Sequence, residues 1–174
     1  MNFRNFARQS IRFSIFVGIL TSSVIASSRA FASDLTDLTR INFYSEISAN
    51  LSGTYILQEN IDIAVDAPPG GTTVFGSFFG TLDGNGKTIS NLTTPLFDTI
   101  ESSGSVGDVQ LEADLDVGLT GRGILANVSN GTIDNVQVAG DVDGGTSYGV
   151  GGLVGENYGT ITSSSSSGVV TGVD

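Results

Sequence analysis

Hydrophobic residues between positions 33 and 52 are spaced as in an amphipathic helix. They follow one another at steps of three and four residues, so one face of a helix can bury them together. The positions that carry this pattern are Ile41, Tyr44, Ile47 and Leu51. The pattern ends at Ser52-Gly53 and does not recur later in the chain. The sequence therefore predicts one short helix in residues 33–52, which caps the structure that follows.

The period of the hydrophobic pattern changes to two at Thr54. Hydrophobic residues then alternate with polar neighbours, as they do in strands that are buried on one face. The alternating positions are Tyr55, Leu57, Ile61, Ile63 and Val65. The run Pro-Pro-Gly-Gly at residues 68–71 indicates a loop. We therefore expect short β-strands from residue 54 onward.

A unit of about 27 residues recurs along the second half of the chain. Residues 104–116 reappear one period later as residues 131–143. A third copy begins a further period on, at Gly159, and a looser, shorter copy covers residues 86–92. Self-similarity at a fixed period indicates a repeat architecture with one supersecondary unit in each copy.

Such a unit gains a hydrophobic core only by stacking on its neighbours, because its strands are too short to form an independent sheet. Val106, Ile133 and Ile161 are equivalent in the three copies, so we expect their side chains to stack. Glycine supplies the corners: residues 70–174 hold 22 glycines, about three times the usual frequency. The predicted fold is all-β, a parallel β-helix (β-solenoid) of about four to five coils over residues 53–174. A β-sandwich, the main alternative, would need regular alternation over longer strands.

Four polar residues are predicted to lie at one corner of successive coils. Each follows an anchoring isoleucine or valine by two residues, and they are Asn91, Asp108, Asn135 and Ser163. An asparagine that turns inward at such a corner can donate a hydrogen bond to the backbone of the next coil. We therefore expect a partial polar ladder, weakened at Asp108, which cannot donate while it is ionised.

Aromatic residues gather in the first coils. The phenylalanines at 75, 78, 79 and 97 are predicted to form a stacked core, although an exposed pair could bind sugar.

Residues 151–161 and 168–172 resemble a GLUG-type repeat. Their sequences are Gly-Gly-Leu-Val-Gly-Glu-Asn-Tyr-Gly-Thr-Ile and Gly-Val-Val-Thr-Gly. Repeats of this type occur in bacterial adhesin-like and filamentous-haemagglutinin-like surface proteins, and beside the zinc peptidase domain of IgA-cleaving proteases. On this resemblance the repeats run over residues 95–120, 121–147 and 148–174.

Residues 53–63 and 79–92 are similar to the opening coils of right-handed β-helices in the same group. The resemblance implies a secreted right-handed parallel β-helix that serves as a scaffold, and it implies no activity. The chain departs from the pattern in its third copy, where Ser163–Ser167 replace the second strand.

The composition excludes several kinds of site, because the chain contains no cysteine and no histidine. It therefore has no Ser-His-Asp triad, no histidine general base, no thiol nucleophile and no disulfide. Zinc sites built from those two residue types are excluded as well. Any catalysis would depend on carboxylates, Lys87, arginines or a bound ion.

Acidic residues dominate the charge after residue 32. Residues 33–174 hold Arg40, Lys87 and Arg122 against 18 acids, for a net charge of 3 − 18 = −15. So acidic a surface repels the phosphates of nucleic acids, which are excluded as partners, and it disfavours anionic membranes. A lyase that acts on an acidic polysaccharide needs a basic cleft, and so negative a chain does not favour one.

The aspartates that follow the repeat period are predicted to form acidic columns. They are Asp108, Asp114, Asp116, Asp134, Asp141 and Asp143. A glycoside hydrolase needs carboxylates that converge within about 5–10 Å. A solvated face that keeps a glycine-rich solenoid soluble is the simpler interpretation, so we predict no catalytic and no cofactor-binding residues.

Asp114, Asp116, Asp141 and Asp143 are candidates for a weak surface calcium site. The two Asp-x-Asp pairs are one repeat period apart, so four carboxylates could line up on one face of a solenoid. The chain lacks both the full EF-hand loop pattern and the G-G-x-G-x-D calcium repeat. No metal is therefore predicted as a resident cofactor.

The sequence favours a secreted or cell-surface module of the adhesin kind, which binds or supports other molecules and has no catalytic activity. Its partner would be a surface ligand such as a host or matrix protein or a glycan. Two alternatives stay open: a polysaccharide-active β-helix enzyme, either a lyase or a hydrolase, and the non-catalytic N-terminal part of a longer surface peptidase. An ordered carboxylate cluster in a groove with aromatic subsites would favour the enzyme.

The last residues keep the rhythm of a coil. Residues 168–174 include no helix pattern, proline or charge run that would close the stack, although terminal repeats normally carry a cap. Because exposed strand edges invite association, we expect continuation into further repeats or end-to-end self-association.

The N-terminal segment, residues 1–32, has the organisation of a signal peptide. Three arginines precede an apolar run over residues 14–26, and Ala30-Phe31-Ala32 supplies the small-x-small cleavage pattern. The uncharged stretch between Arg12 and Arg29 is shorter than the ~20 residues that a membrane span needs. We therefore expect export to the cell surface or the extracellular medium, without a membrane span.

Cleavage is predicted after Ala32, so that the mature protein begins Ser33-Asp34-Leu35. N-terminal sequencing of secreted material checks this start. A mature protein that still carries residues 1–29 would contradict it.

Overall fold

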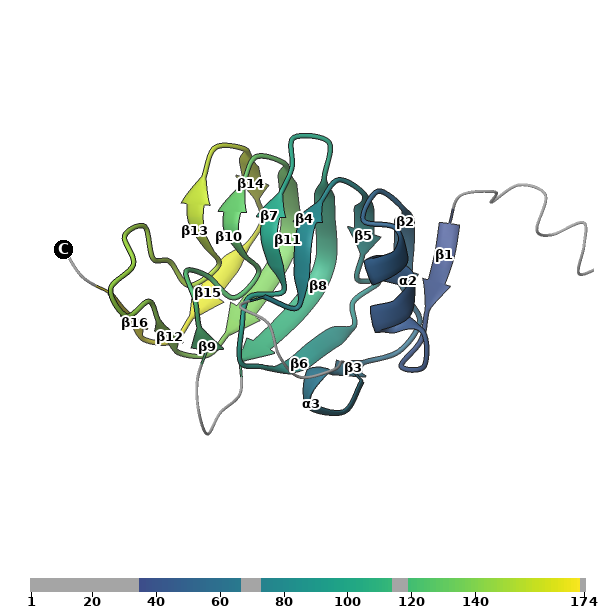
Figure 1. The fold of residues 1–174 in the computed structure, drawn as a ribbon, viewed down its shortest axis with the longest axis horizontal. Coiled ribbons are helices and arrows are strands. Elements are labelled where there is room, and N and C mark those ends of the chain that lie inside the picture. The colour runs from purple at the N-terminus through teal and green to yellow at the C-terminus, as the bar shows by residue number, and fades with distance from the viewer. Residues whose placement is uncertain (1–34, 67–72, 114–118, 173–174) are drawn as a thin grey trace, which may run out of the picture. The chain divides into compact units, whose positions relative to one another are not determined.

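The structure, a computed structural model, describes residues 35–66, 73–113 and 119–172. The predicted signal peptide, the predicted loop at 68–71, and Asp114 and Asp116 lie outside these ranges. The described residues form a parallel β-solenoid of about four turns (Figure 1). The predicted all-β solenoid is therefore confirmed.

Three parallel sheets run along the solenoid and are joined coil by coil. Sheet A holds β1 (Leu35–Leu38), β2 (Thr54–Leu57), β5 (Thr81–Asp83), β8 (Ser105–Ala113), β11 (Thr132–Ala139) and β14 (Thr160–Thr162), with β3 (Ile61–Asp62), β6 (Thr88–Leu92) and β15 (Ser165–Ser167) beside them. Sheet B holds β4 (Phe75–Phe78), β7 (Phe97–Ile100), β10 (Ala126–Ser129) and β13 (Val154–Asn157). Sheet C holds β9 (Leu119–Thr120), β12 (Val142–Asp143) and β16 (Val170–Thr171), and the two helices are α2 (Phe43–Ala49) and α3 (Ile63–Asp66).

A glycine stands immediately before the first sheet A strand of each coil. These glycines are Gly53, Gly80, Gly104, Gly131 and Gly159. Thr132 N–H donates to the carbonyl of Gly104 at 2.9 Å, and the same bond recurs at the other coil starts. A Cβ on Gly131 would lie 2.2 Å from that carbonyl oxygen. The glycines recur because successive coils approach too closely there for any side chain.

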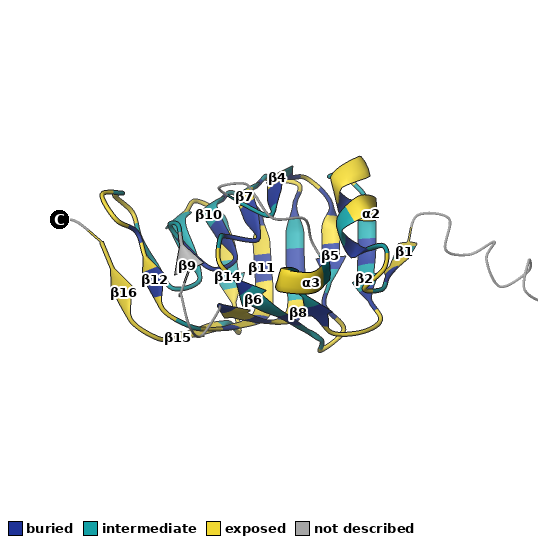
Figure 2. Cartoon of the chain, turned by 60° about the horizontal axis from the view of Figure 1, so that its bottom comes forward, coloured by how far each residue is buried: buried dark blue, intermediate teal, exposed yellow. Residues whose placement is uncertain are grey.

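Side chains in register form columns through the core. Ile133 pairs with Val106 on one side and with Ile161 on the other, which confirms the predicted stacking. Val106 and Ile133 are fully buried, and Ile161 is partly buried. Figure 2 shows buried and exposed positions alternating along β11, where Asp134 is exposed.

The aromatic core lies in the first coils, as predicted for three of the four phenylalanines. Phe75, Phe78 and Phe97 are buried. The ring centroids of Phe78 and Phe97 are 4.6 Å apart in a stacked pair, and those of Phe75 and Phe97 are 5.7 Å apart. The prediction is wrong for Phe79, which is 46% exposed because it lies after β4, at the corner that leads back to sheet A.

The core becomes smaller and more polar from coil to coil. Phe78, Ile100, Ser129 and Asn157 occupy one column of sheet B. The hydroxyl of Ser129 is buried and has no hydrogen-bond partner among the described residues. In the last coil every residue from 165 to 171 is exposed. Apolar burial therefore decreases toward the C-terminal coil.

The predicted N-terminal helix is present as α2 and is shorter than the region predicted for it. It begins at Phe43, so Ile41 lies before it and is 96% exposed. Of the other positions predicted for its buried face, Ile47 is buried, and Tyr44 and Leu51 are partly buried against the core. The strand β1 precedes the helix and pairs with β2, so part of residues 33–52 is the first rung of sheet A.

The helix α2 covers the first aromatic rings of the core. Phe43 lies 5.5 Å from Phe75 in an edge arrangement, and Tyr44 stacks on Phe75 at 5.6 Å. The hydroxyl of Tyr55 donates at the C-terminal end of the helix, where the carbonyls of Glu46 and Asn50 both lie within hydrogen-bond distance. Its burial raises the pKa of Tyr55. The capping role predicted for this segment agrees with these contacts.

The four predicted corner residues all adopt the left-handed conformation, with φ between 52° and 58°. They do not share one corner, because Ile89 pairs with Leu111 and not with Val106. The counterpart of Val106 in that coil is Leu82, so the predicted copy at residues 86–92 is misaligned and Asn91 lies at a different corner.

The polar ladder between Asp108 and Asn135 is on the surface and does not reach the backbone. Asn135 Nδ2 donates to Asp108 Oδ1 at 2.6 Å, and both side chains are exposed. The predicted inward orientation is therefore wrong. Asp108 takes part in this ladder as the acceptor.

Replacing Gly131 with alanine is expected to destabilise the fold, because the new Cβ would collide with the Gly104 carbonyl. We expect a loss of about 1–3 kcal/mol in the free energy of unfolding, as for overpacked cores. Gly76→Ala is the matched control, since its Cβ would meet nothing within 4 Å. Denaturant unfolding checks both variants, and equal losses would show that the glycine stack is unimportant.

Ile133→Asp is expected to cost more than about 3 kcal/mol, because it places an unpaired charge in the core. Asp134→Asn should stay within about 0.5 kcal/mol, since the side chain is exposed and an amide oxygen can still accept a hydrogen bond from Thr162. Thermal unfolding of the two variants measures both effects. Equal shifts would mean that the inward face has been misassigned.

Candidate functional site

The acidic side chains of the coils pair with neutral donors in the next coil. The pairs, acceptor first, are Asp62 with Asn91, Asp98 with Asn127, Asp108 with Asn135, Asp134 with Thr162, and Asp143 with Thr171. Their donor–acceptor distances run from 2.6 to 3.3 Å. The predicted columns of stacked aspartates are therefore wrong for these described residues: each carboxylate is stacked on an amide or hydroxyl.

The four aspartates proposed for calcium are not all described. Asp141 accepts a hydrogen bond from Val169 N–H at 2.8 Å, and Asp143 accepts one from Gly145 N–H at 2.9 Å. The register pairs Asp143 with Thr120 on one side and with Thr171 on the other. Within the described ranges no three acidic groups lie close enough to hold a metal ion. The calcium site stays a prediction.

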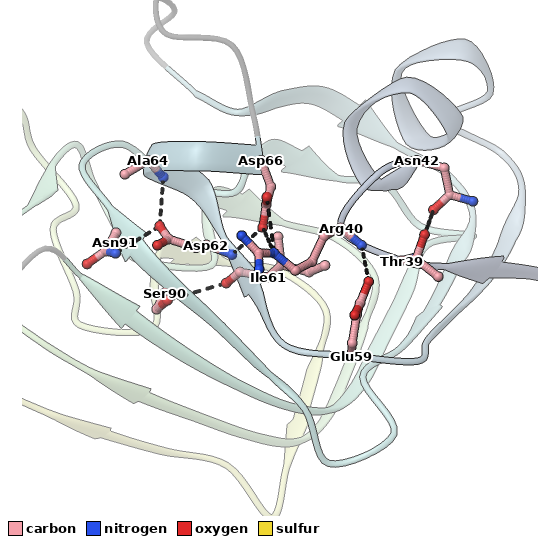
Figure 3. A network of polar contacts seen from close by, with 10 residues as sticks. All are labelled: Thr39, Arg40, Asn42, Glu59, Ile61, Asp62, Ala64, Asp66, Ser90 and Asn91. Carbon is pink, nitrogen blue, oxygen red and sulfur yellow. Dashed lines mark hydrogen bonds and ion pairs between the residues drawn. The ribbon is translucent and has the colours of Figure 1, made fainter.

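The most developed polar cluster joins the turn after β1 to α3 (Figure 3). Arg40 Nε lies 3.2 and 3.0 Å from the two carboxylate oxygens of Asp66. The backbone N–H of Arg40 donates to Glu59 Oε1 at 2.6 Å, and that of Asp62 donates to Asp66 Oδ2 at 2.9 Å. These bonds attach the first rung of the solenoid to the coil that follows.

The same cluster continues into the second coil through Asp62. The Oδ1 atom of Asp62 accepts from Ala64 N–H at 3.0 Å and from Asn91 Nδ2 at 2.8 Å. Ser90 Oγ donates to the carbonyl of Ile61 at 3.3 Å. Figure 3 shows that each of these carboxylates faces its own donor. The cluster is therefore a set of contacts between coils.

The charge on Asp66 is held by its partners. Burial disfavours the ionised carboxylate, whose side chain is 7% exposed. Hydrogen bonds from Arg40 and Asp62 N–H, together with the Arg40 charge, outweigh burial, so the pKa of Asp66 lies below its usual value. The hydrogen bond to Asp66 also raises the pKa of Arg40. Both groups are therefore ionised at neutral pH.

A second ion pair holds the segment between β12 and β13. Arg122 Nη2 bonds to Glu156 Oε1, and Arg122 Nε donates to the Gly149 carbonyl at 3.2 Å. The hydroxyl of Tyr158 donates to Glu156 Oε2 at 2.6 Å. Arg122 and Arg40, two of the three basic residues after residue 32, therefore both join distant parts of the solenoid.

The clusters described above consist of contacts that hold parts of the solenoid together. The chain has no histidine or cysteine, and the carboxylates described above accept from separate donors, so no nucleophile with an adjacent base is in place. Lys87 lies in the turn between β5 and β6 and has no ion pair with a described residue. The described residues therefore offer polar surface for a ligand.

The sequence did not predict the two ion pairs. Arg40 precedes Asp66 by close to one coil length, whereas the separation between Arg122 and Glu156 is longer than a coil. Arg40 is one of few basic residues in a strongly acidic chain, and it lies about one coil length before Asp66. That spacing could have been used to predict the ion pair. The second pair spans the longer segment between β12 and β13 and follows no period.

A family model places the chain among known proteins. The model described as the M26 IgA1-specific Metallo-endopeptidase N-terminal region matches residues 39–140, which is more than half of the chain. No solved structure matches the chain.

Two curated proteins are similar to parts of the chain. Halomucin of Haloquadratum walsbyi is 38% identical over 102 residues, which is 53% of this chain and 1% of halomucin. The immunoglobulin A1 protease of Streptococcus sanguinis is 35% identical over 133 residues, which is 70% of this chain and 7% of the protease. The chain therefore matches only a small share of each relative's length.

The Arg40–Asp66 pair is expected to make stability depend on acid pH. Because the pKa of Asp66 is lowered in the folded state, its contribution is present above the unfolded pKa and is lost as the pH falls through the folded pKa. Asp66→Asn should therefore lose less stability than the unchanged protein as the pH is lowered through and below the usual aspartate pKa of 3.8. Arg40→Met should remove the same acid-sensitive difference. Identical pH profiles of unfolding for all three proteins would contradict this.

Proposed function

The chain belongs to the family of M26 IgA1-specific metallo-endopeptidase N-terminal regions, and we propose that it is a non-catalytic scaffold segment of a larger secreted or cell-surface protein. Of the alternatives that the sequence leaves open, this is the non-catalytic N-terminal part of a longer surface peptidase. The observation that carries the proposal is that the matched residues coincide with the capping helix and the first coils of the solenoid.

The polar contacts support a scaffold role. Within the described coils, acidic side chains bond to amides and hydroxyls one coil away, and the two arginine ion pairs tie distant segments together. Groups that are engaged in holding coils together are poorly placed to act on a substrate. A stiff, linear stack suits the task of holding other parts of a protein at a distance.

The location outside the cell is part of the same proposal. The signal-peptide pattern in residues 1–32 supports export. Neither helix in the described ranges has the length and hydrophobicity to cross a membrane. The GLUG-type repeats and an adhesin-like role are a finer form of this proposal, for which the resemblance of residues 151–172 is the support.

A polysaccharide-active enzyme has less support. Such an enzyme needs carboxylates that converge on a bond, whereas Asp62, Asp98 and Asp134 each accept a hydrogen bond from a donor in the next coil. Purified protein should therefore leave immunoglobulin A1 and polysaccharides intact. Turnover that co-purifies with the chain, and is lost when one of its carboxylates is replaced, would overturn the non-catalytic assignment.

The scaffold role is tested by the distance between the two ends of the solenoid. The chain has no cysteine, so Leu35→Cys and Ser165→Cys, both at exposed positions, introduce a single pair of labelling sites. Energy transfer between the labels should give one narrow distance distribution, because a packed stack holds its ends fixed. A broad distribution like that of a flexible linker of equal length would overturn the proposal.

The last coil is proposed as a junction. Its strands β14, β15 and β16 pair with the preceding coil on one side only, and their outer edges have no strand partner among the described residues. Further coils or a second copy of the chain would complete the pairing.

Purified protein is expected to form dimers or larger species in sedimentation experiments, or to show fast amide exchange from about Gly159 onward. Either result follows from unpaired strand edges and from the small apolar surface of that coil. A strictly monomeric protein with slowly exchanging amides throughout residues 159–172 would contradict the junction.

A further inference from the structure

One outer face of the solenoid carries five uncharged side chains and one carboxylate in register. It lies on the second half of sheet A, where Gln110, Gln137 and Ser165 form one column. The next outward column holds Glu112, Ala139 and Ser167. All six side chains are exposed, and they alternate with core residues such as Leu111 and Val138. We refer to these six residues as the glutamine face.

The glutamine face contains a depression. Ala139 is the smallest side chain of the six, and it lies in a shallow hollow of about 150 Å³ lined by all of them. The hollow is open to solvent and crosses three successive strands, β8, β11 and β15.

The amides on this face keep their hydrogen-bonding capacity. Neither Gln110 nor Gln137 makes a side-chain hydrogen bond to a described residue, whereas the asparagines at 91, 127 and 135 each donate to an aspartate in the preceding coil. A glutamine amide offers two donors and an acceptor with two lone pairs. Two such groups on adjacent rungs, about 4.8 Å apart, can therefore bond to hydroxyls on one ligand.

The residue types and the charge of the glutamine face favour one class of ligand. Protein interfaces depend on aromatic and arginine anchors, and serine is depleted in them; the glutamine face has no aromatic residue and no cation. Anionic polymers are disfavoured, because the face includes Glu112 and residues 33–174 carry a net charge of −15. A neutral ligand that is rich in hydroxyl groups fits both observations.

We propose that the glutamine face binds a neutral polysaccharide that lies along the solenoid axis, with a sugar ring in the hollow at Ala139. Each rung adds weak hydrogen bonds, so several rungs on one polymer give useful affinity by multivalency. This inference rests on the proposed scaffold function and names the kind of surface to which the scaffold attaches.

The test is affinity electrophoresis of the purified chain in native gels that contain dextran, mixed-linkage glucan or mannan. Heparin and hyaluronan serve as anionic controls. Ala139→Arg fills the hollow from an exposed position, and Ser102→Arg makes the same change of charge in the exposed turn after β7. Gln137→Ala removes an amide without adding bulk. It therefore tests the proposal even if Ala139→Arg fails to fold.

At least one neutral polysaccharide should retard the unchanged protein. Ala139→Arg and Gln137→Ala should weaken that binding tenfold or more, and Ser102→Arg should alter it less than twofold. Absence of retardation by every neutral polymer, retardation by the anionic polymers alone, or equal binding by all three variants would overturn the proposal. The end-to-end distance and the lack of turnover are measured separately, so failure here leaves the scaffold function standing.

Discussion

The close approach of one coil to the next at the glycine positions is the constraint on which the rest of the structure depends. The Gly104 oxygen occupies the space that a Cβ of Gly131 would take, and it accepts the first sheet A hydrogen bond of the next coil. Because this contact recurs at the start of each coil, it aligns the residues that follow. In each coil a threonine or serine follows the glycine, and a core residue such as Ile133 comes next, at the same position of the coil. The apolar columns and the polar surface pairs both follow from that alignment.

Alignment also accounts for the tolerance of so much negative charge. When Asp108 lies over Asn135 and Asp134 lies beside Thr162, a carboxylate gains a donor and does not meet another carboxylate. Like charges directly opposite one another in a sheet would be destabilising. The acidic residues are therefore distributed so that each coil presents acids and its neighbour presents donors. The surface stays charged while the contacts between coils stay favourable.

The parts of the fold that repeat could be predicted from the sequence, and the parts that occur once could not. The column through Val106, Ile133 and Ile161 was predicted because its members recur at a near-constant interval. Residues 86–92 were misaligned because the step from Gly80 to Gly104 is shorter than the other steps between coil-start glycines, so local similarity outweighed the true register.

The strand β1 and the Arg40–Asp66 pair have no second copy to compare. The strand β1 is too short to differ in pattern from a helix start, so its pairing with β2 is visible only in the structure. The glutamine face was missed for another reason: its polar side chains are ordinary outward positions of strands, and its hollow depends on which small residue falls between two rungs.

Along the register column from Phe78 through Ile100 and Ser129 to Asn157, the side chains change from buried and apolar to exposed and polar, which gives the solenoid a direction. In a stack where each coil contacts only its neighbours, order spreads from the most stable unit. The aromatic coils are the first to be synthesised. They can therefore fold before the serine-rich coil has left the ribosome, and each later coil packs on one that is already folded. The last described coil, which buries the least apolar surface, therefore folds when the coil beneath it is already formed.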